Sequence, residues 1–309
     1  MSVIAPYILS GGQVEPYCSL TEVKFSPTAS SIDFTNLVEN GAQSAQDRAL
    51  YELIVRASSK IDAYCLGPYG TLNATSNTEN GRYRLDRLGR FRISPAMKPV
   101  IEVTNFVWGT NMGQTYTVPV STQNTWIERD SIIFQAQGAA GVNAVAGMQA
   151  LSWIIGQPYY GEYYCEWTYV NGWANSFTTA TSNIGDTSIT VQNATGFVPN
   201  QNFTLWDGVN DEYCQVSSSY NGTSTTLPLV SGLKYKHGSG VNASTLPAVI
   251  KQACIHFVVG MVKQRGQGGI VLNEMGAETM VAGKSEMSAE DEMRGYDLLD
   301  EFKSVWGRL

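Results

Sequence analysis

The sequence predicts an α+β fold, a small helical bundle with short β-strands and an inserted antiparallel β-domain. Three observations lead to this prediction. Residues 246–265 are almost wholly apolar at helical spacing, period-two segments fill much of 101–170, and Gly- and Asn-bearing turns separate short β segments over 176–240. Hydrophobic residues make up 43% of the chain, enough for a core, and charged residues only 15%, against about 25% in a usual globular protein. We therefore expect much of the surface to be covered by other protein.

The N-terminal third is expected to be extended at first and then helical. Residues 1–18 contain prolines and glycines and predict an arm. Ser19 and Glu22 have the spacing of a capping box, which opens a short helix that Pro27 ends. A second and stronger helix is predicted over Ser44–Leu66, from apolar residues three to four positions apart. A loop rich in Asn, Thr and Gly is expected to follow.

The segment Leu246–Arg265 is predicted to be the core helix of the chain. Pro247 occupies the first helical position, where its missing N–H costs nothing. Apolar side chains wrap nearly the whole cylinder, and Gln252, His256 and Lys263 form the only polar stripe. The predicted organisation is an arm over 1–18, a core over 19–175 and 241–265, an inserted β-domain over 176–240, and a linker with a terminal helix over 266–309.

The terminal helix is predicted from Ser288 to about Trp306, with an apolar face of regular spacing. Two interpretations stay open, because this face could fold back onto the chain's own core or dock in a groove of a partner. The residues of the predicted docking face are Met293, Tyr296, Leu299, Phe302 and Trp306.

Basic side chains crowd one short segment, and their alternation would place several of them on one face of an extended chain. They could contact nucleic-acid phosphates, pair with an acidic surface of a partner or neighbouring subunit, or form an ordinary solvated face. The second interpretation is preferred, and the net charge of −7 argues against a general nucleic-acid binder. These residues are Arg82, Arg84, Arg87, Arg90 and Arg92.

Little in the sequence indicates catalysis. Of the two histidines, His237 is expected to be solvated in a turn and His256 to be a satisfied, partly buried residue of the core helix. Motifs of serine hydrolases, zinc proteases and phosphate-binding loops are missing. The acidic segment 207–212 is interpreted as an Asp-Gly turn, with calcium binding as the lesser alternative. We predict no enzyme, no metal and no cofactor.

Cysteine usage and hydropathy give expectations about compartment. The five cysteines are scattered and lack metal-binding spacing, which is typical of reduced thiols in a cytosolic product. The first residues lack a basic region and a long apolar run, so no signal peptide is expected. Residues 131–161 carry no charge, but polar residues and glycines interrupt them; we expect a loop there, flexible or packed on a neighbouring subunit, and not a membrane span.

Several short motifs follow one another in a recognisable order. They are Ser19–Lys24 at a helix start, Ile61–Gly67 at a helix end, Arg92–Pro95 and Lys98–Val103 at strands, Tyr169–Trp173 at a strand end, Pro247–Ala253 at a helix start and Leu298–Phe302 in the last helix. In this order they resemble the head–tail connector (adaptor) proteins of tailed bacteriophages. The β-domain over 176–240 is additional to the short members of that family, and the region around 26–40 departs from its pattern.

The resemblance implies a structural protein of the virion neck, assembled in the bacterial cytoplasm, whose helical core is a connector fold. Such proteins form a ring beneath the portal, join the head to the tail and extend the DNA channel. The implied partners are further copies of the chain in a dodecameric ring, the portal protein, stopper or tail proteins, and genomic DNA that passes without sequence-specific binding. The resemblance also implies that the terminal helix clasps the portal, and that no catalysis, cofactor or membrane is involved. Gln252, His256 and Lys263 then become a candidate seam between subunits.

Two other interpretations are kept. The chain could be a different structural protein of the same particle, such as a tail-completion or baseplate component. It could also be a carbohydrate- or surface-binding β protein, in which Trp206 and Tyr213 of the aromatic-rich strands would contact the ligand.

Overall fold

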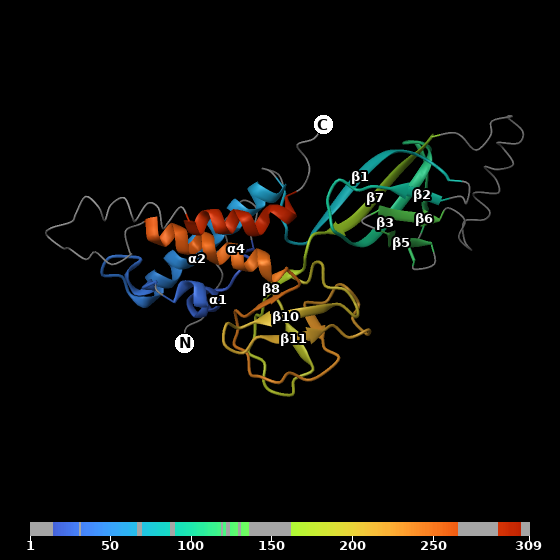
Figure 1. Cartoon of the computed structure of the whole chain (residues 1–309). Coiled ribbons are helices and arrows are strands. Elements are labelled where there is room, and N and C mark those ends of the chain that lie inside the picture. Colours follow the sequence, from blue (N-terminus) through green and yellow to red (C-terminus); the bar gives the residue numbers. More distant parts are fainter. Residues whose placement is uncertain are drawn as a thin grey trace, which may run out of the picture. The chain divides into compact units, whose positions relative to one another are not determined.

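The chain combines helices with several small antiparallel sheets, which confirms the predicted α+β class (Figure 1). The computed structural model describes residues 15–30, 32–66, 70–86, 90–118, 120–121, 124–128, 131–135, 162–264 and 290–303. Two compact units are present: Met1–Asn73 together with Ala174–Leu309, and Ala74–Trp173.

This division differs from the one drawn from the sequence, which joined 19–175 to the core helix and set 176–240 apart. The strands between Ala74 and Trp173 bury their own aromatic core, so they form a unit by themselves. The strands that follow Ala174 fall in the same unit as the helices. Sequence periodicity identifies strands, but it does not say against which core each strand packs.

Three of the four described helices of the first unit begin and end close to the predicted positions, whereas the terminal one, predicted to continue to about Trp306, ends at residue 299. The four are α1 (Leu20–Phe25), α2 (Gln43–Leu66), α4 (Ala248–Val262) and a helix over residues 290–299, with short 3-10 turns η1 (Pro27–Ala29), η2 (Phe34–Asn36) and η4 (Asp300–Phe302). The predicted capping box is confirmed: Ser19 Oγ accepts from the Glu22 N–H at 3.1 Å, and Glu22 accepts from the Ser19 N–H at 2.6 Å.

The core helix α4 is buried on nearly all sides, as its sequence predicts. It packs against α2, and η1 also contacts it. The helix over 290–299, red in Figure 1, runs beside α4 and α2. The approach is close at Gly295, where an added Cβ would lie 2.9 Å from the Phe257 ring. Helices from both ends of the chain therefore build one helical body.

Residues 174–246 form a small closed barrel in the same unit. Its strands are β8 (Asn175–Phe177), β9 (Ser188–Thr190), β10 (Asn202–Trp206), β11 (Glu212–Gln215), β12 (Thr226–Pro228) and β13 (Asn242–Ser244). They pair in the orders β11-β10-β13-β8 and β12-β9. The bridges Thr178–Val191 and Val216–Leu229 connect the two sheets, so the pairings run in a circuit around the apolar interior. Such closure satisfies strand edges that an open sheet would expose.

The second unit consists of two packed antiparallel sheets. Its strands are β1 (Thr75–Arg84), β2 (Arg90–Ile93), β3 (Val100–Asn111), β4 (Gln114–Val118), β5 (Thr125–Glu128), β6 (Ser131–Gln135) and β7 (Glu162–Asn171), in the orders β1-β7-β3-β4 and β2-β6-β5. Aromatic rings fill the space between the sheets, with Phe106 of β3 stacked on Phe134 of β6 at 3.9 Å between centroids.

The predicted loop after α2 is wrong from Thr75 onward. This polar segment is strand β1, and each of its ten residues has a partner in β7. Of the uncharged segment 131–161, residues 131–135 form β6 and residues 136–161 lie outside the described part of the chain. No helix within the described ranges has the length and apolar character needed to cross a membrane.

Candidate functional site

The terminal helix over 290–299 folds back onto the chain's own core. Leu299 is completely buried, and the Tyr296 ring lies 4.7 Å from the Tyr64 ring and 5.0 Å from the Phe257 ring, between centroids. Ion pairs accompany these contacts, because Asp291 accepts from Lys263 at 2.6 Å and Glu292 from Lys60 at 3.0 Å. The sequence left two interpretations open, and in the structure this helix packs on the chain's own core.

The predicted docking face therefore needs correction. Leu299 and Tyr296 face the chain's own helices, Met293 is 65% exposed, and Phe302 is half-buried. Trp306 lies outside the described residues. The error has a physical reason, since an apolar stripe at helical spacing looks the same whether it covers its own core or a partner. Portal docking stays a prediction, and Met293 is the exposed member of the face on which it depends.

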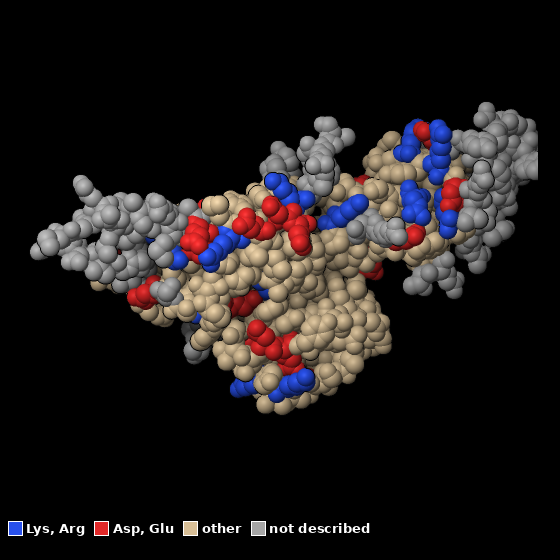
Figure 2. All heavy atoms as spheres, viewed as in Figure 1, with Lys and Arg blue, Asp and Glu red and all other residues tan. Residues whose placement is uncertain are grey.

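The predicted arginine cluster lies on the second unit and is largely neutralised within it. Arg84 pairs with Glu162 at 3.3 Å, Arg90 with Asp86 at 2.9 Å and Arg92 with Glu128 at 3.1 Å. Arg82 is exposed and has no ion-pair partner among the described residues, and Arg87 lies outside them. Figure 2 shows blue and red side chains alternating on this unit. The pairing favours a mixed-charge surface over a basic patch for phosphates.

The polar stripe of α4 contacts residues of the same chain. Gln252 donates to Thr28 Oγ1 at 2.7 Å, and Lys263 pairs with Asp291. His256 Nδ1 is 3.6 Å from an Asp291 oxygen, and it has no hydrogen bond within the described structure. Burial lowers the pKa of His256, and Asp291 opposes this shift. The predicted seam between subunits is thus occupied by η1 and the terminal helix.

His237 is not solvated, contrary to the prediction. Its side chain is fully buried, with Nδ1 3.0 Å from Asp207 Oδ2 and Nε2 3.3 Å from Glu212 Oε2. Each ring nitrogen therefore lies within hydrogen-bonding distance of one carboxylate oxygen. Its carboxylate partners lie at least 25 residues earlier in the chain, so local sequence gives no sign of the arrangement.

The acidic segment 207–212 forms the predicted Asp-Gly turn. Asp211 Oδ1 accepts from the N–H groups of Asp207 and Gly208, both at 2.9 Å. Gly208 has φ +82°, and a Cβ added there would lie 3.0 Å from the Thr21 carbonyl oxygen, so both its backbone conformation and its surroundings favour glycine. No group of three or more His, Cys, Asp or Glu side chains in the described ranges is arranged to hold a metal ion.

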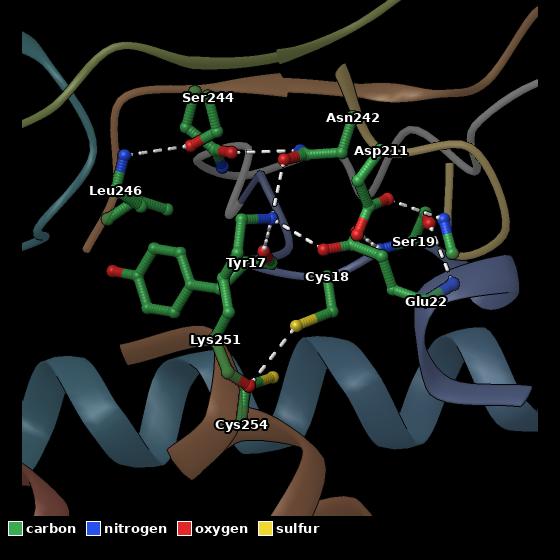
Figure 3. Close-up of polar contacts among 12 residues, drawn as sticks. Tyr17, Cys18, Ser19, Glu22, Asp211, Asn242, Ser244, Leu246, Lys251 and Cys254 are labelled. Carbon is green, nitrogen blue, oxygen red and sulfur yellow. Dashed lines mark hydrogen bonds and ion pairs between the residues drawn. The ribbon is translucent and has the colours of Figure 1, made fainter. Parts of the chain in front are cut away.

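The most unusual polar site of the molecule surrounds Lys251, which the sequence analysis did not single out. This lysine is 3% exposed and lies on α4 (Figure 3). Its Nζ donates to the Tyr17 carbonyl at 2.9 Å, to Glu22 Oε1 at 2.7 Å and to Asn242 Oδ1 at 2.6 Å. The Trp206 ring lies below the ammonium, 5.1 Å from Nζ to the centroid. We call Lys251, Glu22, Asn242 and Trp206 the buried lysine cluster.

Each member of the buried lysine cluster comes from a different element. Glu22 belongs to α1, Asn242 to β13 and Trp206 to β10, so the barrel and two helices meet at one ammonium group. Burial raises the pKa of Glu22, and Lys251 opposes the shift. Taking two charged groups out of water costs several kcal/mol per ion before the pair forms. A lone charged residue inside an otherwise apolar core helix was the sequence signal that could have found this site.

The cluster is extended by further buried hydrogen bonds. Asn242 Nδ2 donates to Asn175 Oδ1 at 2.8 Å and to the Ser176 carbonyl at 3.3 Å. Cys18 Sγ donates to the Lys251 carbonyl at 3.4 Å, and burial raises the pKa of the Cys18 thiol well above its usual range. All five cysteines of the chain are buried and unpaired. The hydrogen bonds of Asn242 thus hold its side-chain amide on both atoms, the oxygen through Lys251 and the nitrogen through Asn175 and Ser176.

Comparisons of the chain with protein-family models, curated proteins and solved structures found no match.

Proposed function

We propose that this chain is a structural neck protein of a tailed-phage virion, which forms an adaptor ring beneath the portal, joins head to tail and extends the DNA channel. The observation that carries the proposal is that three of the motif-bearing segments, those of α1, α2 and α4, pack together. The motif at Ser19–Lys24 opens α1, the motif at Ile61–Gly67 spans the end of α2, and the one at Pro247–Ala253 opens α4. These helices pack together although they are far apart in the sequence.

The polar chemistry of the chain supports a structural role. Both histidines lie beside carboxylates of the same chain, His237 between Asp207 and Glu212 and His256 near Asp291. Contacts of this kind between side chains from different segments help to hold the elements together. The net charge of −7 also suits a channel through which DNA must slide, since each phosphate neutralised by a basic side chain would add affinity for the passing duplex.

The carbohydrate-binding alternative is weakened at one of its two residues. Trp206 lies against the Lys251 ammonium, and its indole nitrogen is buried. A sugar would need that ring face free for stacking. Tyr213 is 68% exposed on β11 and stays available.

The proposal is tested by electron microscopy and mass photometry of the purified protein, alone and mixed with the portal protein of the same phage. We expect ring-shaped particles, either free or seated on the portal. Ring symmetry unlike that of the portal would favour a tail-completion or baseplate component. A protein that stays monomeric alone and with portal contradicts the proposal.

A variant at Met293 tests the portal-docking face. Deleting the terminal helix would also remove Leu299 from the core, so a point change is the sharper experiment. Met293→Glu changes an exposed side chain and should leave the fold intact. If Met293 contacts the portal, its replacement should lower the affinity for portal about tenfold or more. Co-purification with portal is the readout, and Asp297→Ala, an exposed position on the same helix, is the matched control. Unchanged binding by Met293→Glu would place docking elsewhere.

A further inference from the structure

We infer that Lys251 and Asn242 become joined by an intramolecular isopeptide bond, formed by the folded chain itself with Glu22 as the acid–base group. The geometry that supports this is the buried lysine cluster, where Nζ lies 2.6 Å from Asn242 Oδ1 and 2.7 Å from Glu22 Oε1 (Figure 3). Asn242 is fully buried, and Lys251 and Glu22 are 3% and 6% exposed. The inference is independent of the proposed function.

The amine must be neutral to act as a nucleophile, and Glu22, whose Oε1 lies 2.7 Å from Nζ, is the group placed to take its proton. In a site closed to water, the charged forms of a Lys–Glu pair lose their hydration, and a proton shared between the two groups can rest on the carboxylate. Burial raises the pKa of Glu22, which is the direction that this transfer needs. Lys251 is thus paired with a base at contact distance, as an activated nucleophile requires.

The amide group that would be attacked is held beside the amine. Asn242 Nδ2 is fixed by Asn175 Oδ1 and the Ser176 carbonyl, so its carbonyl oxygen is directed at Nζ. Hydrogen bonding from Nζ polarises that carbonyl. The Tyr17 carbonyl holds a third N–H of the amine. Fixing the two groups side by side removes the entropy cost of bringing them together, which is one part of the barrier to aminolysis of an amide.

The reaction balances without any co-reactant. The Lys251 ammonium gives one proton to Glu22, and Nζ attacks Cγ of Asn242. A second Nζ proton reaches Nδ2 through the Glu22 carboxyl group, the Cγ–Nδ2 bond breaks, and ammonia leaves. A secondary amide remains between Nζ and Cγ. Glu22 returns its proton to the ammonia, which departs as ammonium, and Glu22 ends as the carboxylate with which it began.

The bond would fasten the barrel to the core helix. Asn242 lies in β13, where the last barrel strand leads toward α4, and Lys251 lies in the first turns of α4. An amide bond at this place would keep β13 and α4 joined even when the surrounding hydrogen bonds break. The hydrogen-bonded junction of the buried lysine cluster becomes a covalent one.

The test is the intact mass of the denatured full-length protein. We expect a mass below that of the encoded sequence by one ammonia molecule. Trypsin does not cut after an acylated lysine, so residues 237–263 should stay in one peptide that lacks one ammonia. Fragment ions from backbone cleavage between Asn242 and Lys251 should be missing, because the bond closes that segment into a loop. The encoded mass with normal cleavage after Lys251 overturns the inference.

Variants separate this bond from other losses of mass. Lys251→Met should restore the full mass expected for its sequence, whereas Lys60→Met, which removes another ion-paired lysine, should keep the loss of ammonia. A succinimide at Asn242 also loses ammonia, but it would persist in Lys251→Met and hydrolyse in mild base. That result overturns the inference, and so does a loss of water, which would indicate a Lys251–Glu22 link.

The role of Glu22 is tested by Glu22→Gln, an isosteric change that removes the acid–base group. We expect a folded protein, checked by circular dichroism, with the full mass for its sequence. A folded variant that still loses ammonia at the wild-type rate removes Glu22 from the mechanism. If the variant does not fold, the mass and the fragment map of the wild-type protein still decide whether the bond exists.

Discussion

Asp62, near the end of α2, is a carboxyl group whose charge the fold disfavours. It accepts hydrogen bonds from the Tyr17 hydroxyl and, at 2.9 Å, from the Leu72 N–H. Burial raises the pKa of Asp62 from 3.8 to about 6, against the opposing effect of these hydrogen bonds. The folded protein therefore holds a proton on Asp62 at pH values where the unfolded chain has released it.

This shift predicts a pH dependence of stability with a defined sign. The contribution of the protonated acid is fully present below pH 3.8 and is lost as pH rises through about 6. Relative to Asp62→Asn, which cannot titrate, the wild-type free energy of unfolding should fall by about 2 kcal/mol between pH 4 and pH 7. Urea titrations across this pH range measure the difference. The exposed change Asp297→Asn is the control, and an Asp62→Asn profile parallel to wild type would contradict the prediction.

Leu299 and Met293 lie on the same helix and should respond very differently to truncation. Leu299→Ala removes a fully buried side chain and should cost about 2–5 kcal/mol of unfolding free energy, through lost burial and the cavity left behind. Met293→Ala changes a side chain that is 65% exposed and should stay within about 0.5 kcal/mol. Denaturant unfolding of both variants is the measurement. Equal, small effects would mean that the helix does not pack on the core in solution.

At the scale of elements, the contact between the terminal helix and α4 depends on a glycine. Alanine at position 295 would gain about 1 kcal/mol in helix propensity. Its Cβ would lie 2.9 Å from the ring of Phe257, which is fully buried and closely surrounded. Overpacking of this kind costs about 1–3 kcal/mol, so we expect Gly295→Ala to be destabilising on balance.

Gly238→Ala is the matched control for Gly295→Ala. Its added Cβ would meet no atom within 4 Å, so little change or a slight gain in stability is expected. Thermal unfolding of the two variants measures the contrast. A stabilised Gly295→Ala would show that the helix can move away from α4 at little cost.

The elements also show why some of the fold could be predicted and some could not. α2, α4 and the capping box at Ser19 depend on residues that are neighbours in the sequence, and these were predicted correctly. β1 was not predicted, because its polar residues carry no apolar alternation and its strand state comes from β7, which follows it by about 80 residues. The surroundings of His237 and Lys251 were missed for the same reason, since their partners come from distant segments.

At the scale of the whole molecule, each of the two units brings the ends of its own segments together. In the second unit, the Ala74 N–H donates to the Trp173 carbonyl at 2.8 Å. In the first, Asn175 Nδ2 donates to Asn73 Oδ1 at 3.0 Å. The chain thus leaves and re-enters the first unit at one place. Such neighbouring ends are typical of an inserted domain.

This geometry predicts that the two units can be separated. A fragment of residues 74–173 should fold alone, because its aromatic core is built from its own strands. The remaining chain, with 74–173 replaced by a short Gly/Ser linker, should keep its helical body and barrel, because the ends that the linker joins are already neighbours. Circular dichroism and cooperative denaturant unfolding of both proteins are the measurements. A fragment that unfolds without a cooperative transition would mean that the core of residues 74–173 depends on the rest of the chain. The shortened protein offers a second measurement, its intact mass. Because Lys251 and Asn242 both lie in the first unit, this protein should still be lighter by one ammonia molecule if the bond between them forms.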